Sequence, residues 1–186
     1  LAVPGVPPPA SPQAAWGRMA EQGRSKDTLA GHWELMGVVA DRPFSLFPRG
    51  FPEDFIAEFK RRTGVAGVLG NKPASGTEII AELGEEHVRG GRPIVYTSAD
   101  SVLQIAAHEE VIPLPRLYEM CRQARSLGDD WRIGRIIARP FVGRPGDFRR
   151  TANRRDFAMP PPGETALDVL LRGGLSVTAV GKIEDI

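Results

Sequence analysis

The sequence predicts an α/β protein, more specifically an α+β domain in which helices cover a mixed β-sheet. Apolar residues recur at helical spacing in several segments, short apolar runs rich in valine and isoleucine lie between them, and glycine or proline separates most of these elements. Strands interspersed with helices along a chain favour a layered arrangement of helices and sheet. At 186 residues, the chain is long enough for one well-cored domain with a short appendage.

The first part of the chain is expected to be irregular. Residues 1–12 contain five prolines, which are incompatible with a helix interior. A helix is predicted over 52–62, because proline stands at its start, apolar side chains share one face and glycine follows its end. The compact part of the protein should therefore begin near Pro43.

A strand and a second helix are expected next. The run 65–69 is apolar and short, as in a strand. Ser75 and Glu78 have the spacing of a capping box, which predicts a helix start at this point. We expect Gly84 to break or bend that helix, since glycine is a poor helix former.

The remaining elements alternate between strand and helix. The final strand is predicted from the alternation of apolar and polar residues at Leu175, Val177 and Ala179. The preceding elements are strands over 94–97, 102–106 and 133–138, and helices over 114–127 and 165–171.

Positive charge is concentrated in one stretch although the net charge is only +1. Between Trp131 and Arg155 there are eight arginines and a single acidic residue, Asp147. Such a concentration of arginine attracts phosphate groups. The charge pattern therefore suits a cleft for an anionic ligand.

The single cysteine and the hydropathy pattern bear on location. Cys121 lies among the apolar positions of a predicted helix, so we interpret it as a buried structural thiol rather than a nucleophile. No stretch has the ~20 apolar residues of a membrane span, and no basic start followed by an apolar run indicates a signal peptide. We expect a cytoplasmic protein with no membrane partner.

Five segments in register carry the strongest functional signal. They are Lys-Asp-Thr-Leu-Ala-Gly-His-Trp-Glu at 26–34, Gly-Asn-Lys-Pro-Ala-Ser-Gly-Thr-Glu-Ile at 70–79, Tyr-Thr-Ser-Ala-Asp-Ser with the following nine residues at 96–110, Gly-Arg-Ile-Ile-Ala-Arg-Pro-Phe-Val-Gly at 134–143 and Val-Gly-Lys-Ile-Glu-Asp-Ile at 180–186. Together they resemble phosphopentomutase, a metalloenzyme family of the alkaline phosphatase superfamily. The resemblance covers nearly the whole chain.

The resemblance implies a domain division and an incomplete enzyme. Residues 1–41 would be a core-derived segment with the phosphate-accepting loop, 42–178 the cap that sets substrate specificity, and 179–186 the return to a metal-binding core. The cap would be inserted into an alkaline-phosphatase-like core that is mostly absent from this chain. We therefore expect this segment alone to be inactive, with the missing core of the same protein as its partner.

Thr28 is the residue that the resemblance identifies as the phosphate acceptor and as a metal contact. A threonine hydroxyl is too weakly acidic to attack phosphorus unaided, so it needs a metal ion or a base. The resemblance implies two divalent metal ions, expected to be Mn²⁺, and a sugar bisphosphate activator, either glucose 1,6-bisphosphate or ribose 1,5-bisphosphate. The alternative is that Asp27 or Thr28 simply caps a helix.

The cap residues implied as substrate ligands are Asp100, Arg135, Arg150 and Lys182. Asp100 would accept hydrogen bonds from ribose hydroxyls, and the three cations would hold the distal phosphate. Each has a structural alternative, namely a turn residue for Asp100 and solvated surface charges for the others. The glycine-containing run at 72–77 leads into a helix start but lacks the spacing of a Walker loop, so we interpret it as a structural turn that could contact phosphate weakly.

The three histidines are not expected to bind the metals directly. We predict that His32 orders the loop that carries Thr28, that His87 is a solvated surface residue, and that His108 is structural. None lies in a segment that resembles the metal-binding motifs of the family.

The predicted function is that of a phosphopentomutase, which interconverts ribose 1-phosphate and ribose 5-phosphate, or their 2-deoxyribose equivalents, through a phosphothreonine and a bisphosphate intermediate. An alternative is a non-catalytic sugar-phosphate-binding module or pseudoenzyme, because Ser25, Leu29 and Ala30 depart from the family pattern. A weaker alternative is RNA binding through the arginines at 149–155, which lack interleaved aromatic platforms beyond Phe148 and Phe157. We therefore expect pentose phosphates, and no nucleic acid, as partners.

Overall fold

The computed structural model describes residues 4–5, 7, 10–11, 17–25 and 27–181. Its centre is a mixed sheet in the order β1-β2-β3-β4-β5, with β6 also paired to β4. β1 is parallel to β2 and β3 is parallel to β4, whereas the other neighbours are antiparallel. The strands are β1 (Leu69–Pro73), β2 (Ile94–Thr97), β3 (Val102–His108), β4 (Arg135–Val142), β5 (Arg149–Arg150) and β6 (Arg155–Ala158).

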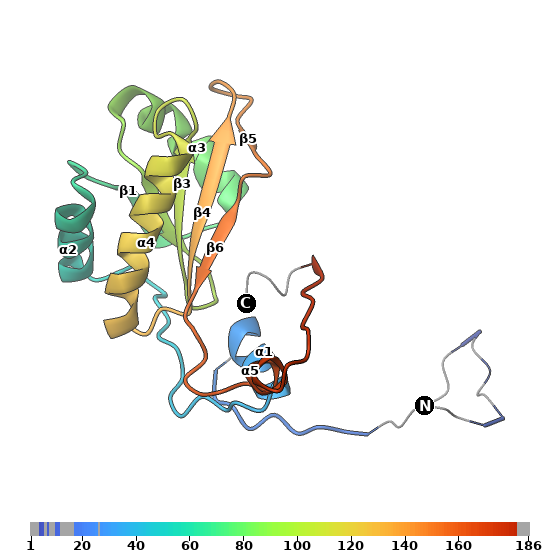
Figure 1. Cartoon of the computed structure of the whole chain (residues 1–186). Helices are drawn as coiled ribbons and strands as arrows, with labels where there is room; N and C mark the ends of the chain where they lie inside the picture. The colour runs from blue at the N-terminus through green and yellow to red at the C-terminus, as the bar shows by residue number, and fades with distance from the viewer. Residues whose placement is uncertain (1–3, 6, 8–9, 12–16, 26, 182–186) are drawn as a thin grey trace.

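Helices cover both faces of the sheet, as Figure 1 shows. α2 (Glu53–Thr63) and α4 (Leu114–Asp130) pack on one face, where their apolar side chains join Leu103, Ile105 and Ile136 in the larger core. α3 (Gly76–Gly90) packs on the other face in a smaller core. The predicted mixed sheet with covering helices is therefore confirmed.

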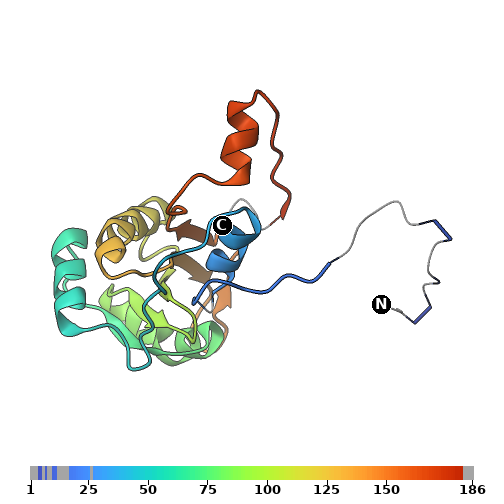
Figure 2. The same ribbon diagram turned by 90° about the horizontal axis from the view of Figure 1, so that it is seen from below.

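Two further helices lie outside this sandwich (Figure 2). α1 (Thr28–Leu35) packs through Leu29 and Trp33 against Phe44 and the residues that follow β6. α5 (Ala166–Arg172) is joined to the end of α1 by a hydrogen bond from the Ala166 N–H to the Met36 carbonyl at 2.8 Å. None of the helices in the described ranges is long and apolar enough to cross a membrane.

The alternation of side chains along the central strands decides what each face contains. On β3, Leu103 and Ile105 join the core beneath α2 and α4, whereas Ala106 joins the core beneath α3. On β4, Ile136 and Ala138 face α4, so the odd-numbered residues point to the opposite face. α3 covers only part of that opposite face.

Several predicted boundaries are confirmed and others are wrong. The helices near 52–62, 114–127 and 165–171 and the strands near 94–97, 102–106 and 133–138 are present. The strand expected over 65–69 begins only at Leu69, and residues 175–179 form no strand in the structure. Residues 175–179 are mostly exposed. Alternating apolar residues form a stable strand only when they pack against a neighbouring strand or a core, and these residues do not.

The helix start predicted from Ser75 and Glu78 is confirmed, because α3 begins at Gly76 with Ser75 at the N-cap position, but two further predictions about this helix are wrong. The Ser75 side chain makes no cap to the helix and instead lies 3.1 Å from the Thr77 hydroxyl. Gly84 does not interrupt the helix, which continues to Gly90. A Cβ at Gly84 would lie 2.5 Å from the Phe148 ring, so glycine at this position makes room for an aromatic side chain.

His87 is buried, and the expectation of a solvated residue is wrong. Its Nδ1 donates to the Arg92 carbonyl at 2.6 Å, and its Nε2 accepts from the His108 N–H at 2.8 Å. Burial lowers the pKa of His87, partly opposed by the hydrogen bond to Arg92. Cys121 is buried as expected, and burial raises the pKa of its thiol.

We predict that His87 makes the protein less stable as the pH falls. Because the pKa is lowered in the folded state, the unfolded chain takes up the proton first as the pH drops below the ordinary value near 6.5. The free energy of unfolding should then decrease by up to about 1.4 kcal/mol per pH unit. Urea unfolding at pH 7.5, 6.5 and 5.5 should show a shallower dependence for His87→Gln than for the wild type, and equal slopes would contradict the prediction.

Candidate functional site

The sheet face beneath α3 is divided into an apolar half and a polar half. α3 packs mainly against β1, β2 and β3, and it reaches β4 only at Phe141. The polar half of the face carries Gln104, Arg135, Arg139 and Arg154, which line a cavity of about 690 Å³. A cavity of this volume is suitable for a sugar phosphate.

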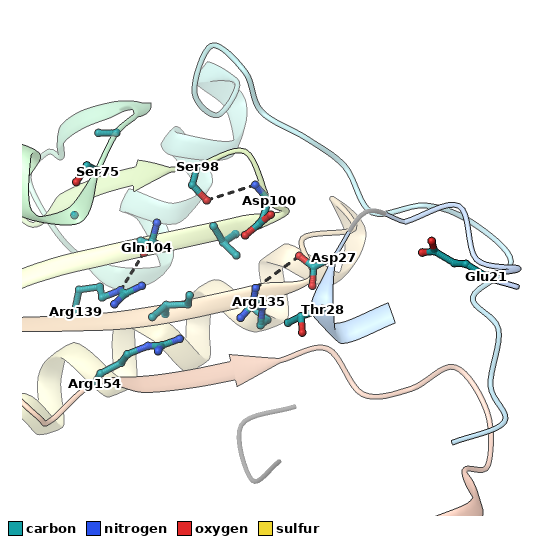
Figure 3. Close-up of a pocket in the computed structure, with 14 residues that line it drawn as sticks. Glu21, Asp27, Thr28, Ser75, Ser98, Asp100, Gln104, Arg135, Arg139 and Arg154 are labelled. Carbon is teal, nitrogen blue, oxygen red and sulfur yellow. Dashed lines mark hydrogen bonds and ion pairs between the residues drawn. The ribbon is translucent and has the colours of Figure 1, made fainter. Parts of the chain in front are cut away.

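Side chains from distant parts of the chain line this cavity (Figure 3). One end contains Asp27, Thr28, Asp100 and Arg135, and the other contains Ser75, Arg139 and Arg154. The first end combines the start of α1 with the turn between β2 and β3. The second end lies beside the start of α3.

Thr28 is the first residue of α1 and is partly buried. Asp27 is the N-cap, and its Oδ1 accepts a hydrogen bond from the Leu29 N–H at 2.9 Å. The capping alternative is thus confirmed for Asp27, and it leaves the Thr28 side chain free to line the cavity. The first turn of a helix favours an anion, because its N–H groups and dipole are positive.

His32 holds Thr28 but cannot act as its base. The His32 Nδ1 lies 2.7 Å from the Thr28 carbonyl oxygen and 3.3 Å from the Thr28 hydroxyl. Since a carbonyl only accepts hydrogen bonds, Nδ1 must carry the hydrogen and has no lone pair to take a proton from Thr28. This arrangement is compatible with the loop-ordering role expected for His32.

Ser25, Leu29 and Ala30, which flank Thr28, are all buried. The buried Ser25 hydroxyl accepts a hydrogen bond from the Phe44 N–H at 3.0 Å. Leu29 and Ala30 are buried in the small core beneath α1. Ser25 thus fixes the loop through a hydrogen bond, and Leu29 and Ala30 fix the start of α1 through apolar packing.

Arg135 joins the start of α1 to the sheet. Its guanidinium lies 3.7 Å from Asp27 Oδ2 and 3.6 Å from Asp156 Oδ2, and both carboxylates are only 2% exposed. Asp156 Oδ2 also accepts a hydrogen bond from Arg154 at 2.6 Å. The predicted phosphate ligand Arg135 thus lines the cavity while it balances two buried carboxylates.

The other predicted residues are placed differently. Asp100 lines the same cavity as Thr28, within the turn between β2 and β3. Arg150 lines a neighbouring cavity of about 540 Å³, which shares Arg139 and Arg154 with the first. Lys182 lies outside the described residues.

Sequence reasoning missed Asp27 as a carboxylate of the cavity and Arg139, Arg154 and Gln104 as parts of its wall. Arg139 could have been found from strand alternation, since it lies four residues after Arg135 and so shares its face. Gln104 could not, because its role depends on which strand pairs with β4.

A two-metal centre is not built from this part of the chain. Among the described residues, no group of three or more His, Cys, Asp or Glu side chains could hold a metal ion. The residues present do not fit such a centre by themselves. Thr28 is the one expected metal contact that falls within the described ranges.

The fold and cavity define a mixed α/β protein with an arginine-rich cavity beside the start of α1. No family model matches the sequence. The chain is 59% identical over 182 residues to a phosphopentomutase of Anaeromyxobacter sp. (strain Fw109-5), covering 98% of this chain and 47% of that protein. It is 62% identical over 173 residues to a phosphopentomutase of Caldanaerobacter subterraneus subsp. tengcongensis, covering 92% of this chain and 44% of that protein.

A phosphopentomutase of Symbiobacterium thermophilum is 60% identical over 187 residues, covering all of this chain and 47% of that protein. The chain is therefore homologous to phosphopentomutases over its full length, and the predicted resemblance is confirmed. It spans about half the length of the curated relatives it matches.

We predict that Arg135→Met destabilises the fold strongly. The substitution leaves Asp27 and Asp156 buried without their shared counter-charge, which should cost about 3–5 kcal/mol. Arg149→Met is the matched control, because Arg149 pairs with Asp147 on the exposed surface and should change stability by less than ~1 kcal/mol. Urea unfolding at neutral pH compares the two, and equal losses would contradict the bridging role of Arg135.

Proposed function

We propose that this chain supplies the phosphate-accepting loop and the cap of a phosphopentomutase. In this proposal, residues 1–41 belong with a metal-binding core, 42–178 form the cap, and 179–186 return to the core. Homology to phosphopentomutases over the whole chain supports the assignment. The observation that carries it is the position of Thr28 at the start of α1, in one cavity with Asp100 and several arginines.

The proposed reaction moves one phosphoryl group in each of two steps. The phosphoryl group leaves the Thr28 oxygen for the free O1 or O5 of ribose 5-phosphate or ribose 1-phosphate, or of a 2-deoxyribose equivalent. The sugar hydroxyl loses its proton, and overall the Thr28 oxygen regains one. The bisphosphate then reorients and returns its other phosphoryl group to Thr28, which completes the isomerisation.

The residues of this chain would bind and orient the sugar phosphate. Asp100 would accept hydrogen bonds from ribose hydroxyls, and Arg135, Arg150 and Lys182 would hold the distal phosphate. His32 would keep Thr28 oriented through its hydrogen bond to the Thr28 carbonyl. Walls formed by the cap would exclude water from the phosphothreonine.

Two divalent metal ions, expected to be Mn²⁺, would stabilise the negative charge of the transferring phosphoryl group in the complete site. Their ligands other than Thr28 would come from outside the described residues, and a sugar bisphosphate would serve as activator. For this reason we expect the segment alone to be inactive and the complete protein to act in the cytoplasm.

A second candidate function is sugar-phosphate binding without catalysis. The observation in its favour is that the hydrogen on His32 Nδ1 prevents this nearest ring nitrogen from activating Thr28. In that case the cavity would bind a pentose phosphate and Thr28 would never be phosphorylated.

We predict that Thr28 becomes phosphorylated when the intact protein is incubated with Mn²⁺ and glucose 1,6-bisphosphate. Intact mass measurement and peptide mapping should locate one added phosphate at Thr28. Thr28→Val should gain none and should lose mutase activity by roughly a thousandfold or more, as expected for a lost nucleophile.

Thr178→Val, at an exposed threonine, is the control and should be phosphorylated like the wild type. If the wild-type protein binds ribose 5-phosphate but Thr28 gains no phosphate, the catalytic proposal is wrong and the binding function remains.

A further inference from the structure

The pairing of β4 with β6 places a carboxylate among the arginines of the cavity wall. In this antiparallel register Asp156 stands opposite Ile137, which lines the cavity. Its diagonal neighbours on the same face of the sheet are therefore Arg135 and Arg139. Long side chains reach across such a diagonal, so one carboxylate lies within range of two arginines that line the cavity.

The Asp156 carboxylate is fixed in place behind the cavity wall. Only 2% of its side chain is exposed, and its Oδ2 accepts a hydrogen bond from Arg154 at 2.6 Å. Burial lowers the pKa of Arg139, and the charge of Asp156 is among those that oppose this shift. Asp156 therefore influences the cavity through the arginines beside it and not by contact with a ligand.

Arg135 is directed by carboxylates that do not use up its donors. The Arg135 guanidinium lies 3.6 Å from Asp156 Oδ2 and 3.7 Å from Asp27 Oδ2, and both separations exceed an N–H···O hydrogen bond. Among the described residues, Arg135 Nε has no hydrogen-bond partner either. The two carboxylates attract different nitrogens of the guanidinium, which limits its orientations. A phosphate group in the cavity can then accept from the N–H groups that line it.

The charge of Asp156 and its position have opposite effects on an anionic ligand. A carboxylate beside the cavity repels a phosphate group, so removal of its charge alone would strengthen phosphate binding. A carboxylate that holds Arg135 in the orientation for binding has the reverse effect, since its loss frees the guanidinium to turn away. The sign of the change in affinity therefore distinguishes the two roles.

We propose that Asp156 is a positioning residue that orients the Arg135 guanidinium for the phosphate group of the ligand. This inference rests on the proposed function, in which Arg135 binds the distal phosphate of a sugar phosphate. Arg154 anchors Asp156 through its hydrogen bond, and Asp156 directs Arg135. Asp27 acts on Arg135 as well, but it also caps α1. Substitution of Asp156 therefore isolates the effect.

Asp156→Asn tests the orientation, because it removes the charge and keeps the size of the side chain. Calorimetric titration with ribose 5-phosphate uses the intact protein carrying Thr28→Val, so that no phosphoryl transfer occurs. Asp156→Asn should weaken ribose 5-phosphate binding about tenfold, the size expected for a lost hydrogen bond to a charged group. Asp147→Asn is the matched control, since it removes an exposed carboxylate from the same arginine-rich segment, and it should leave the affinity equal or slightly higher.

The proposal also requires that Asp156 act through Arg135. Arg135→Lys retains the positive charge and removes the fork, so it should weaken ribose 5-phosphate binding while both carboxylates keep a counter-charge. Adding Asp156→Asn to Arg135→Lys should change the affinity by less than about twofold, because no fork remains to be oriented. Two independent losses that multiply would overturn the proposal.

Asp156→Glu is a second variant that keeps the charge of the wall, and it decides the question alone if Asp156→Asn does not fold. Its carboxylate is displaced by one methylene, so ribose 5-phosphate binding should again weaken. A role of charge alone gives parental affinity for Asp156→Glu and tighter binding for Asp156→Asn. A purely structural role lowers thermal stability and gives parental affinity for both folded variants. Either pattern would show the inference to be wrong.

Inorganic phosphate as a second ligand separates this inference from the proposed function. A parent protein that binds inorganic phosphate but not ribose 5-phosphate would reject the sugar-phosphate function. The same variants are then compared by their affinity for inorganic phosphate, and a tenfold loss in Asp156→Asn would still support the positioning role. None of these titrations depends on whether Thr28 is phosphorylated, so a failure of the proposed catalysis leaves the result for Asp156 intact.

Discussion

The buried ion pairs of Arg135 are the interaction on which the site depends. Arg135 projects from the middle strand of the polar half-face and lies between Asp27, which caps α1, and Asp156 of β6. Charges removed from water are costly unless they are paired, so the three groups require one another. Through this constraint, the start of the helix that carries Thr28 is held against a sheet whose own core lies elsewhere. The position of the Thr28 hydroxyl is thus set by electrostatics, with the small core around Trp33 and Phe44 as its apolar support.

A second constraint follows from the length and position of α3. The helix covers β1 to β3 and buries Ile79 and Ile80 against them, but it reaches β4 only at Phe141. The part of the same face that α3 leaves open lines the cavity, and its alternating positions carry Arg135, Arg139 and Asp156 together with the aliphatic Ile137. On the other face of β4, Ile136 and Ala138 join the core beneath α4. One strand therefore contributes to a core and to a ligand cavity because its two faces meet different neighbours.

Much of this fold could be predicted from the sequence, because strong periodicity and local turn signals decide it. The helix near 52–62 and the buried strands at 94–97 and 102–106 follow from such signals. What failed depends on contacts between distant segments. Gly84 resembles a helix breaker until Phe148 is placed against it, and His87 resembles a surface residue until the His108 N–H is found at its ring. The cavity shows the same division: Thr28 and Asp100 were found from motifs, whereas Gln104 becomes informative only once β3 and β4 are aligned.

The distribution of exposed apolar side chains separates the sheet domain from the segments around it. Within the sandwich, apolar side chains are mostly buried, and large exposed ones are confined to Leu46 and Val88 among the described residues. The other exposed ones belong to α1, α5 and their flanking segments: Met19, Leu35, Val39, Val169, Leu170, Leu171, Leu175 and Val180. Burial of such side chains is favourable by about 1.5–3 kcal/mol each, so the sheet domain is self-sufficient in a way that the α1 and α5 region is not. This contrast supports the proposed assignment of residues 1–41 to a larger core, and it sets the start of α5 apart from the cap with which sequence reasoning grouped it. Thr28 would then lie at the junction between a self-contained cap and a core that completes the site.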